Sequence, residues 1–526
     1  MKYLIQIFVT GFIVFIQPVN GQFFNDEGLK FMKLFDWINT SYVDSVNIEK
    51  FSDEIIRESL HKLDPHSVYL TKDEAKALNE SLEGNFEGIG VHFNILNDTI
   101  FIITPIKGGP SEKAGIKAGD RIITIEGENV AGVKITSKQV TSKLKGKGGT
   151  LVHVQVIRKQ AKKLVSVGII RDKIPINSID AAYKIDDRTG YIKLSRFSHT
   201  TMNELTKVLT KFNNDHTNNL ILDFSGNGGG YFEVAIALAD QFLDADKLIV
   251  RTKGIHSEKK EFSTAKGLFE KGNLIIIIDE GSASASEIVA GAVQDWDRGL
   301  IVGRRSFGKG LVQKRLPFPD GSEVRLTVER YYTPTGRLIQ KTYAGGYKEY
   351  SGEVNKRFGH GELLNKDSIR FDDSLKLYTL NLKRKVFGGG GIMPDIFVPL
   401  DTSRYSAYFN NLLTTGVINS FIIQYVDENR NLLRKKYPEF KSFQIKFEVD
   451  NILLDKLKKY AEERAVKYDS SGFERSENYL TCYIKALIAR NIWESNEFYE
   501  IYNQTDPSFL KALEAIKNLN TYLTSN

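Results

Sequence analysis

Residues 274–313 read LIIIIDEGSASASEIVAGAVQDWDRGLIVGRRSFGKGLVQ, and this segment predicts a strand, a tight turn and a helix in close succession. The β-branched run 274–278 is typical of a strand buried on both faces, and Glu280-Gly281 ends it in a turn. The small and apolar residues 288–293 suit a helix. The serines at 282, 284 and 286 therefore lie at or near a helix N-terminus, where free N–H groups and the dipole stabilise negative charge. Such a turn suits a nucleophile and half of an oxyanion hole.

The same turn has two other interpretations. Ser284 is followed three residues later by Glu287, which is the pattern of a capping box and needs no catalysis. A Ser-His-Asp triad has no local support, because the histidines lie at 61, 66, 92, 153, 199, 216, 256 and 360. The partners of a triad can be far apart in sequence, however. The residues of the turn alone therefore leave capping and catalysis open.

The nearest candidate base is Lys309, in the glycine-flanked segment SFGKG that follows the apolar run 300–303. The reference pKa of a lysine, about 10.4, must fall by several units before the amine accepts a proton at neutral pH, and burial lowers it. A segment that packs against the core provides such burial. The alternative interpretation is a solvated loop lysine.

Residues 303–309 also match the first seven positions of a phosphate-binding loop, G-x-x-x-x-G-K, and follow a predicted strand. Gly310 stands where that motif has the Ser or Thr that holds magnesium. Residues 311–316 alternate like a strand, whereas a phosphate loop opens a helix. Both departures argue against nucleotide binding.

The motifs GSASASEIVAGAVQD and GRRSFGKGLVQ together resemble the C-terminal processing peptidases, also called tail-specific proteases, which use a Ser-Lys dyad. The resemblance runs from about residue 31 to about residue 400. It implies that Ser284 is the nucleophile, Lys309 the general base and Gln313 the residue that orients the lysine. It also implies that Ala285 supplies one oxyanion N–H.

A second part of the predicted site lies in the glycine-rich run SGNGGG, residues 225–230. It follows the strand predicted at 219–224, and the alternation of strands and helices before it implies an α/β core with a largely parallel sheet. The resemblance places the second oxyanion donor on Gly229 or Gly230. The family commonly has an arginine where this chain has Ser225, which puts the salt bridge of that arginine in doubt.

Residues 83–171 resemble a PDZ domain, through FEGIGV at 86–91 and GPSEKAGIKAGDRI at 109–122. The predicted peptide-binding residues are Gly88, Ile89, Gly90 and Val91. Glycines let backbone N–H groups converge on a terminal carboxylate, and the strand that begins at Val91 can pair with an extended peptide. The implied ligand is an unstructured, apolar protein C-terminus.

The remaining boundaries follow from composition along the chain. Residues 1–21 resemble a signal peptide with cleavage before Gln22, and a retained anchor is the alternative. Residues 22–82 are predicted to form a helical region in which LDPHS, at 63–67, is a structural turn. The protease core is expected at 172–400, with closing strands and turns at 330–337 and 391–395. A contact of Arg337 with substrate is the alternative to a purely structural role. Residues 401–526 are expected to form a helical domain, with helices at 455–468, 478–493 and 508–518.

Composition limits the other functions. A net charge of +7 is small for 526 residues and gives no sign of a nucleic-acid partner. The single cysteine, Cys482, excludes an intramolecular disulfide and a CxxC metal site. No metal or cofactor is expected. Membrane proximity, a homo-oligomer or an activating adaptor are all compatible with this composition.

The sequence as a whole predicts a multidomain α/β protein with a helical N-terminal region, a PDZ domain, a protease core and a helical C-terminal domain. The predicted function is that of an exported serine endopeptidase, in the periplasm or cell envelope, that recognises free apolar C-termini of protein substrates and cleaves through a Ser-Lys dyad and an acyl-enzyme. The alternative is a non-catalytic PDZ scaffold or chaperone of the cell envelope.

Overall fold

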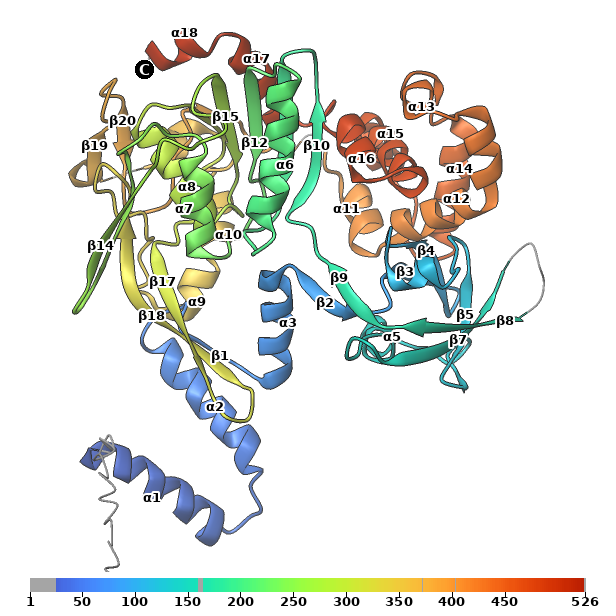
Figure 1. Ribbon diagram of the computed structural model, residues 1–526, viewed down its shortest axis with the longest axis horizontal. Coiled ribbons are helices and arrows are strands. Elements are labelled where there is room, and N and C mark those ends of the chain that lie inside the picture. Colours follow the sequence, from blue (N-terminus) through green and yellow to red (C-terminus); the bar gives the residue numbers. More distant parts are fainter. Residues whose placement is uncertain (1–24, 159–163, 371, 403, 525–526) are drawn as a thin grey trace, which may run out of the picture. The chain divides into compact units, whose positions relative to one another are not determined.

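The structure is a computed structural model that describes residues 25–158, 164–370, 372–402 and 404–524 (Figure 1). It divides into two compact units, residues 1–59 and 60–526. The predicted signal peptide lies outside the described residues. No helix in the described ranges is both long and apolar enough to cross a membrane.

The first unit contains helix α1 (Asp26–Ser41) and most of helix α2 (Ile48–His61). The side chain of Asn25 caps α1 by accepting a hydrogen bond from the Gly28 N–H at 2.9 Å. The predicted helical character of the N-terminal region is therefore confirmed.

A six-stranded sheet forms the centre of the second unit, in the order β10-β11-β12-β15-β16-β21. Strand β10 is antiparallel to β11, and all other neighbours are parallel, so the predicted largely parallel sheet is confirmed. The strands are β10 (Ile179–Lys184), β11 (Thr189–Leu194), β12 (Asn219–Asp223), β15 (Asn273–Ile278), β16 (Leu300–Gly303) and β21 (Ile396–Phe397). Almost every residue of β11 and β15 is buried, as expected when both faces of a sheet are covered.

Helices cover the two faces of this sheet. One face packs against α6 (Thr201–Asn214), α7 (Phe232–Asp240) and α8 (Ala285–Asp295) in a shared apolar cluster. On the other face, α17 (Pro507–Lys517) contributes Phe509 and Ile516 to a second cluster with the sheet. A helix near the end of the chain thus covers the central sheet.

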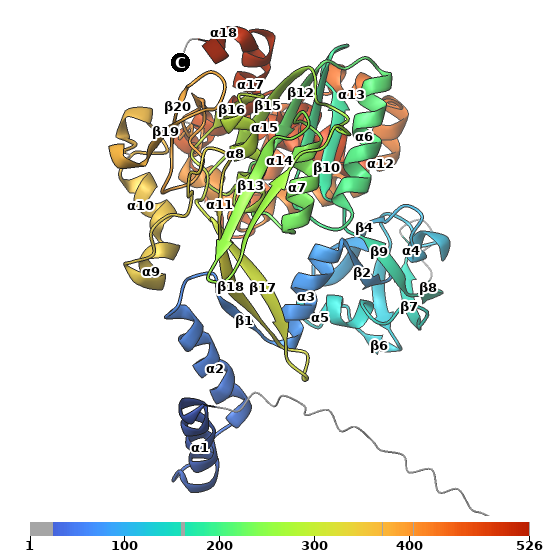
Figure 2. The same cartoon turned by 60° about the vertical axis from the view of Figure 1, so that its left-hand side comes forward.

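A second sheet of the core is antiparallel, in the order β1-β18-β13-β14, with β17 paired to β18. The strands are β1 (Val68–Leu70), β13 (Leu248–Gly254), β14 (Glu258–Phe262), β17 (Leu311–Pro317) and β18 (Glu323–Tyr332). Strands β17 and β18 lie side by side as a hairpin (Figure 1 and Figure 2). The chain therefore continues from Lys309 into a strand, and a phosphate loop, which would open a helix there, is excluded.

The predicted PDZ region follows helix α3 (Lys72–Glu83) and is joined to the core by β2 (Asn85–Gly88) and β9 (Asp172–Pro175), which pair with each other. Its sheet has the order β3-β4-β5-β7-β8, with β6 paired to β5. The elements are β3 (Val91–Leu96), β4 (Thr99–Pro105), α4 (Pro110–Lys113), β5 (Arg121–Ile125), β6 (Glu128–Asn129), α5 (Ser137–Leu144), β7 (Leu151–Ile157) and β8 (Leu164–Ile170). Strand β3 lies at an edge of this sheet.

Short elements close the core, and a helical region follows it. The short elements are α9 (Gly346–Ser351), α10 (Glu353–Gly359), η1 (Lys366–Ser368), η2 (Asp373–Leu375), β19 (Lys376–Tyr378) and β20 (Lys385–Phe387). The later helices are α11 (Ala407–Thr414), α12 (Val417–Lys436), α13 (Phe440–Lys446), α14 (Asn451–Glu462), α15 (Ser470–Ile492), α16 (Ser495–Tyr502) and α18 (Leu519–Thr524). Helices α11 to α16 share one apolar cluster. The predicted helical C-terminal region is confirmed.

Candidate active site

Ser284 stands at the junction between strand β15 and helix α8, as the residue that caps the helix. Its φ of +56° lies in the left-handed region, which a residue other than glycine adopts only when its surroundings hold it there. Such strain costs on the order of 1–3 kcal/mol and is common at functional sites. The turn between β15 and α8, residues 279–284, is the elbow of the site, and it holds Ser284 in a strained backbone conformation.

The other two serines of the turn have structural roles. Ser282 donates its hydroxyl hydrogen bond to the Phe224 carbonyl at 2.8 Å, and Ser286 donates to the Asn227 carbonyl at 2.9 Å. Both serines are fully buried, whereas Ser284 is partly exposed. Of the three serines, Ser284 is thus the one that a substrate can reach.

Asn227 ties the glycine-rich loop to the elbow. Its carbonyl accepts from the Ala283 N–H at 3.0 Å as well as from Ser286. Its side chain donates to the Leu194 carbonyl and accepts from the Gly229 N–H, each at 2.9 Å. The predicted oxyanion loop therefore has a fixed position beside the turn that carries Ser284.

Only glycine fits at the two positions predicted to supply the second oxyanion donor. A Cβ on Gly229 would lie 2.9 Å from the Cβ of Ser284, and a Cβ on Gly230 would lie 1.9 Å from the Phe197 carbonyl oxygen. The Gly229 N–H already donates to Asn227. The N–H groups of Gly230 and Ala285 donate to no acceptor in the described part of the chain. These two groups are the better candidates for the oxyanion hole.

The buried carboxylate of Glu287 joins the elbow to the lysine segment. Its Oε2 accepts from the backbone N–H of Ser284 at 2.8 Å and from that of Lys309 at 2.9 Å. Its Oε1 accepts from the Ser306 hydroxyl at 2.5 Å and from the Gly308 N–H at 2.7 Å. Burial raises the pKa of Glu287, while these donors stabilise its charged form. Glu287 therefore does more than cap α8, although the capping-box arrangement is present.

Tyr331, on β18, lies next to the backbone carbonyl groups of Ser284 and Lys309. Its hydroxyl lies 3.1 Å from the Ser284 carbonyl oxygen and also within hydrogen-bond distance of the Lys309 carbonyl oxygen. The side chain is 1% exposed, and burial raises its pKa well above the usual value. A neutral hydroxyl is therefore retained between the two carbonyls at all ordinary pH values.

Lys309 itself has the electrostatic character that a base requires. The surrounding protein lowers its pKa to about 8, chiefly through desolvation, although the charge of Glu287 acts in the opposite direction. In the part of the chain that the structure describes, no hydrogen bond joins the Lys309 amine to the Ser284 hydroxyl. The two backbones are neighbours, and the four side-chain torsions of lysine allow its amine to move.

The amide of Gln313 lies in a different hydrogen bond from the one expected. It donates to the Thr327 hydroxyl at 3.4 Å, and that hydroxyl donates to Asp64 at 3.1 Å. Asp64 in turn exerts a charge effect that raises the pKa of Lys309. The proposed orienting role of Gln313 stays a prediction.

The turn at residues 63–67 lies closer to the candidate dyad than its sequence suggested. His66 Nε2 is 2.5 Å from the Tyr350 hydroxyl, and its ring contacts the Phe307 ring edge-on at 6.3 Å between centroids. Burial, followed by the charge of Lys309, lowers the pKa of His66 to about 3. His66 is therefore neutral and borders the lysine segment.

Sequence reasoning missed the roles of three residues near the dyad, which are Glu287 as a link, Tyr331 and His66. The sequence pattern SASE did single out Glu287, its fourth residue, but this pattern predicts only a helix capping box. Tyr331 and His66 are distant from the dyad in sequence and have no local signal.

The predicted peptide-binding loop of the PDZ region has free donors. The N–H groups of Ile89 and Gly90 donate to no acceptor among the described residues. The Ile89 carbonyl accepts from Ser111, which fixes the loop. Val91 opens the edge strand β3, and Gly88 ends β2. The loop can therefore receive a carboxylate, and the edge can receive an extended chain.

Ser225, where the resemblance implies an arginine, has a different cation nearby. Lys193 Nζ donates to Asp223 Oδ1 at 3.0 Å and to the Ser225 carbonyl at 2.6 Å. Tyr191 donates to the other oxygen of Asp223 at 2.7 Å. Asp223 is therefore paired without an arginine at 225. Farther on, Arg337 is buried and pairs with Asp295, which agrees with the structural role expected of this segment.

No metal centre accompanies this site in the described ranges, where no group of three or more His, Cys, Asp or Glu side chains has a metal-binding arrangement.

Comparison with known proteins assigns two of these regions. Peptidase family S41 matches residues 188–346, and the PDZ domain family matches residues 88–169. A family of unknown function matches residues 408–494.

Relatives match over most of the chain. Carboxy-terminal processing protease CtpB of Bacillus subtilis (strain 168) is 32% identical over 440 residues, which cover 81% of this chain and 89% of that protein. A carboxy-terminal-processing protease of Bartonella bacilliformis is 33% identical and covers 59% of this chain and 72% of its own length. The solved photosystem II D1 C-terminal processing protease is 27% identical, with a TM-score of 0.35. The match covers 60% of this chain and 91% of that chain. The chain therefore belongs to peptidase family S41, as a carboxy-terminal processing protease of the serine type that carries a PDZ domain.

Proposed function

We propose that the protein is an exported endopeptidase that captures unstructured, apolar protein C-termini and cleaves the attached chain through a dyad of Ser284 and Lys309. One observation carries the dyad. Glu287 and Tyr331 contact both residues, one through their N–H groups and the other through their carbonyl groups. This double link keeps the nucleophile and the base together although they are 25 positions apart in sequence.

In the first half of the reaction, neutral Lys309 takes the proton of the Ser284 hydroxyl as Oγ attacks the scissile carbonyl. Negative charge collects on the carbonyl oxygen, and the N–H groups of Ala285 and Gly230 donate to it. When the tetrahedral intermediate collapses, the C–N bond breaks and protonated Lys309 gives its proton to the leaving amine. The product is an acyl-enzyme on Ser284.

In the second half, water attacks the ester. Lys309 accepts a proton from the water, the same two N–H groups stabilise the second oxyanion, and the proton returns to Ser284 Oγ as the ester bond breaks. The lowered pKa of Lys309 supports both steps, because an appreciable neutral fraction exists near neutral pH. Gln313 keeps its proposed role as an orienting residue, acting after Lys309 moves toward Ser284.

Recognition of the substrate is assigned to the PDZ domain. The free N–H groups of Ile89 and Gly90 face a terminal carboxylate, and Val91 begins the strand edge that pairs with the preceding residues. Apolar specificity is proposed from the resemblance, as is export to the periplasm or cell envelope from the character of residues 1–21.

A cleavage assay separates this proposal from the alternatives. The chain from Gln22 onward is incubated with an unfolded protein that has an apolar C-terminus, beside Ser284→Ala, Ser282→Ala and Lys309→Ala. We expect cleavage by the parent, none by Ser284→Ala or Lys309→Ala, and retained binding of the C-terminus by both. Cleavage that survives in Ser284→Ala and disappears in Ser282→Ala would show that Ser282, and not Ser284, is the nucleophile. Intact binding with no cleavage by any form would favour the scaffold.

A further inference from the structure

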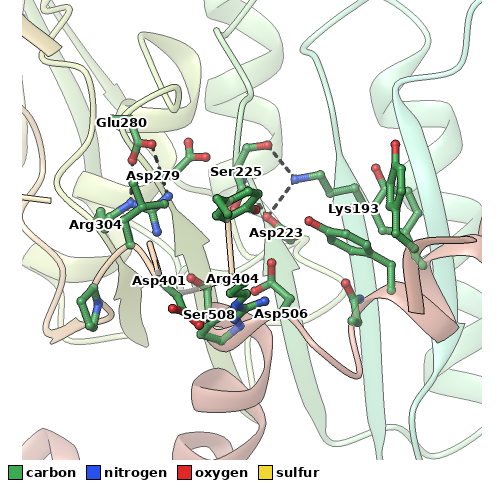
Figure 3. Close-up of a pocket in the computed structure, with 18 of the residues that line it drawn as sticks. Lys193, Asp223, Ser225, Asp279, Glu280, Arg304, Asp401, Arg404, Asp506 and Ser508 are labelled. Carbon is green, nitrogen blue, oxygen red and sulfur yellow. Dashed lines mark hydrogen bonds and ion pairs between the residues drawn. The ribbon is translucent and has the colours of Figure 1, made fainter. Parts of the chain in front are cut away.

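A cavity lies between the sheet of the core and the helices at the end of the chain. Its volume is about 490 Å³, and neither Ser284 nor Lys309 lines it. Ser225, Asp279 and Glu280 line one side, immediately after strands β12 and β15. Figure 3 shows these residues on one side, with Arg404, Asp506 and Ser508 facing them. The carboxyl ends of parallel strands are a common place for ligand sites.

Each cation of the cavity wall already has an acidic partner. Arg304 pairs with Glu280 at 2.7 Å, Lys193 with Asp223 at 3.0 Å and Arg404 with Asp401 at 2.6 Å. These pairs are visible as neighbours in Figure 3, where dashed lines mark the first two. The three cations therefore leave no positive charge in excess for an anionic ligand.

Two carboxylates of the wall remain without such a partner. In the described part of the chain, neither Asp279 nor Asp506 forms an ion pair with a lysine or an arginine. Asp506 Oδ1 accepts from the backbone N–H of Phe509 at 2.9 Å. Burial raises the pKa of both groups, because desolvation destabilises a charged carboxylate.

Asp279 directs one oxygen away from its backbone partners. Its Oδ1 accepts from the N–H groups of Gly226 and Gly281 and from the Ser282 hydroxyl. Its Oδ2 accepts no hydrogen bond from any residue that the structure describes. A lining carboxylate oxygen without a donor is available to a ligand that donates.

Aromatic side chains line the same cavity as these acids. The rings belong to Tyr405, Tyr483, Phe498, Tyr499 and Tyr502. Rings of this kind attract organic cations through their faces, and a guanidinium also stacks on them. Carboxylates and aromatic rings that line one cavity are the chemistry that recognises an alkylated cation.

The small size of Ser225 accounts for part of the open volume of the cavity. Residue 225 is a serine, whose short side chain lines the cavity. A long cationic side chain at 225 would start from the wall that holds Asp279. The short serine leaves both the room and the acids without such a group.

We propose that this cavity binds a small organic cation, with a guanidinium or primary ammonium group between Asp279 and Asp506 and an alkyl stem against the aromatic wall. This site is separate from the proposed dyad and does not depend on it. The cation is either a free amine or guanidine, or the side chain of an arginine or lysine in a bound polypeptide.

The test is a calorimetric titration of the chain from Gln22 onward with n-butylguanidinium, and in parallel with n-butylurea, which has a similar shape and no charge. We expect saturable one-to-one binding of the cation and at least about 10-fold weaker binding of the urea. Equal binding of the two compounds, or no binding of the cation, would overturn the proposal. A blocked Gly-Arg-Gly peptide distinguishes the sources, because it binds only if the cavity admits a polypeptide side chain.

Three variants locate the site. Asp506→Asn keeps the helix cap of α17, since asparagine is an equally good N-cap, but removes the charge. Ser225→Arg supplies a guanidinium from the chain itself. We expect each to weaken n-butylguanidinium binding about 10-fold or more, whereas Asp450→Asn, the same change at the cap of α14, leaves it unchanged. Binding that persists equally in all three variants would show that the cation binds elsewhere and would overturn the assignment.

Discussion

The backbone N–H of Lys309 donates to the carboxylate of Glu287 at 2.9 Å, and the same carboxylate oxygen also accepts from Ser284. One buried side chain thus fixes the candidate base relative to the candidate nucleophile. Because Glu287 belongs to the first turn of α8, the helix that follows the elbow also holds the lysine segment. The candidate dyad is therefore held by a short-range contact and a long-range contact that share Glu287.

Glu287→Gln is expected to damage both activity and stability. The amide can no longer accept from all four donors, so buried N–H or O–H groups lose their partner. We expect the free energy of unfolding to fall by about 2–4 kcal/mol and kcat/KM to fall about 100-fold or more as the dyad loses its geometry. Urea unfolding and peptide cleavage measure the two effects.

The matched control for this change is Glu349→Gln, at an exposed carboxylate that pairs with Lys356. This control is expected to unfold at the same urea concentration as the parent and to keep full activity. A Glu287→Gln protein with parental kinetics would contradict the positioning role.

Tyr331→Phe tests the contact on the carbonyl side. The ring keeps its packing, but the Ser284 and Lys309 carbonyls lose the hydroxyl between them. We expect a loss of about 1–2 kcal/mol in stability and about 10-fold in kcat. Tyr332→Phe, at the next residue of β18, serves as the control and should behave like the parent. Equal kinetics for the two variants would show that the Tyr331 hydroxyl does not position the dyad.

The pH dependence of kcat/KM is expected to follow the titration of Lys309. The charged amine cannot accept a proton, and its pKa is lowered to about 8, so activity should rise as the pH increases through about 8 and then level off. His66 has a pKa of about 3 and stays neutral over this range. A rise centred near 6.5 instead would point to a histidine base and against Lys309.

Two adjacent glycines give a sharp test of the oxyanion loop. Gly229→Ala places a methyl group 2.9 Å from the Ser284 Cβ at a φ of +100°, and we expect kcat to fall about 100-fold or more. Gly228→Ala adds a methyl group with no heavy atom within 4 Å and should keep activity within about 3-fold of the parent. Similar losses in both variants would indicate that the loop tolerates no change at all, and that Gly229 has no special contact with the nucleophile.

Much of the fold was predictable because its signals are local. The run 274–278 became β15, and the alternation at 311–316 became β17. Helix α12 was not predicted, although Val417, Phe421 and Ile422 have helical spacing and would have indicated it. The cover that α17 provides for the central sheet was also not predictable, because the strands that it contacts, β12, β15 and β16, lie more than 200 residues earlier.

The candidate site was predictable only in part. Ser284, Lys309 and the glycine pair came from motifs and from the family resemblance, and the structure brings Gly229 into contact with Ser284. The double use of Glu287 and the place of Tyr331 depend on tertiary contacts that no local pattern encodes. For Gln313 the resemblance implied a partner in Lys309, while its amide here binds Thr327.

The most direct test of the dyad is mass spectrometry of the acyl-enzyme, with the parent and Lys309→Ala each quenched in acid during turnover of a peptide substrate. The account predicts an acyl group on Ser284 in the parent and none in Lys309→Ala, because without the base the hydroxyl does not attack. An acyl group on Ser282 or Ser286, or an equal amount of acylation in Lys309→Ala, would contradict it.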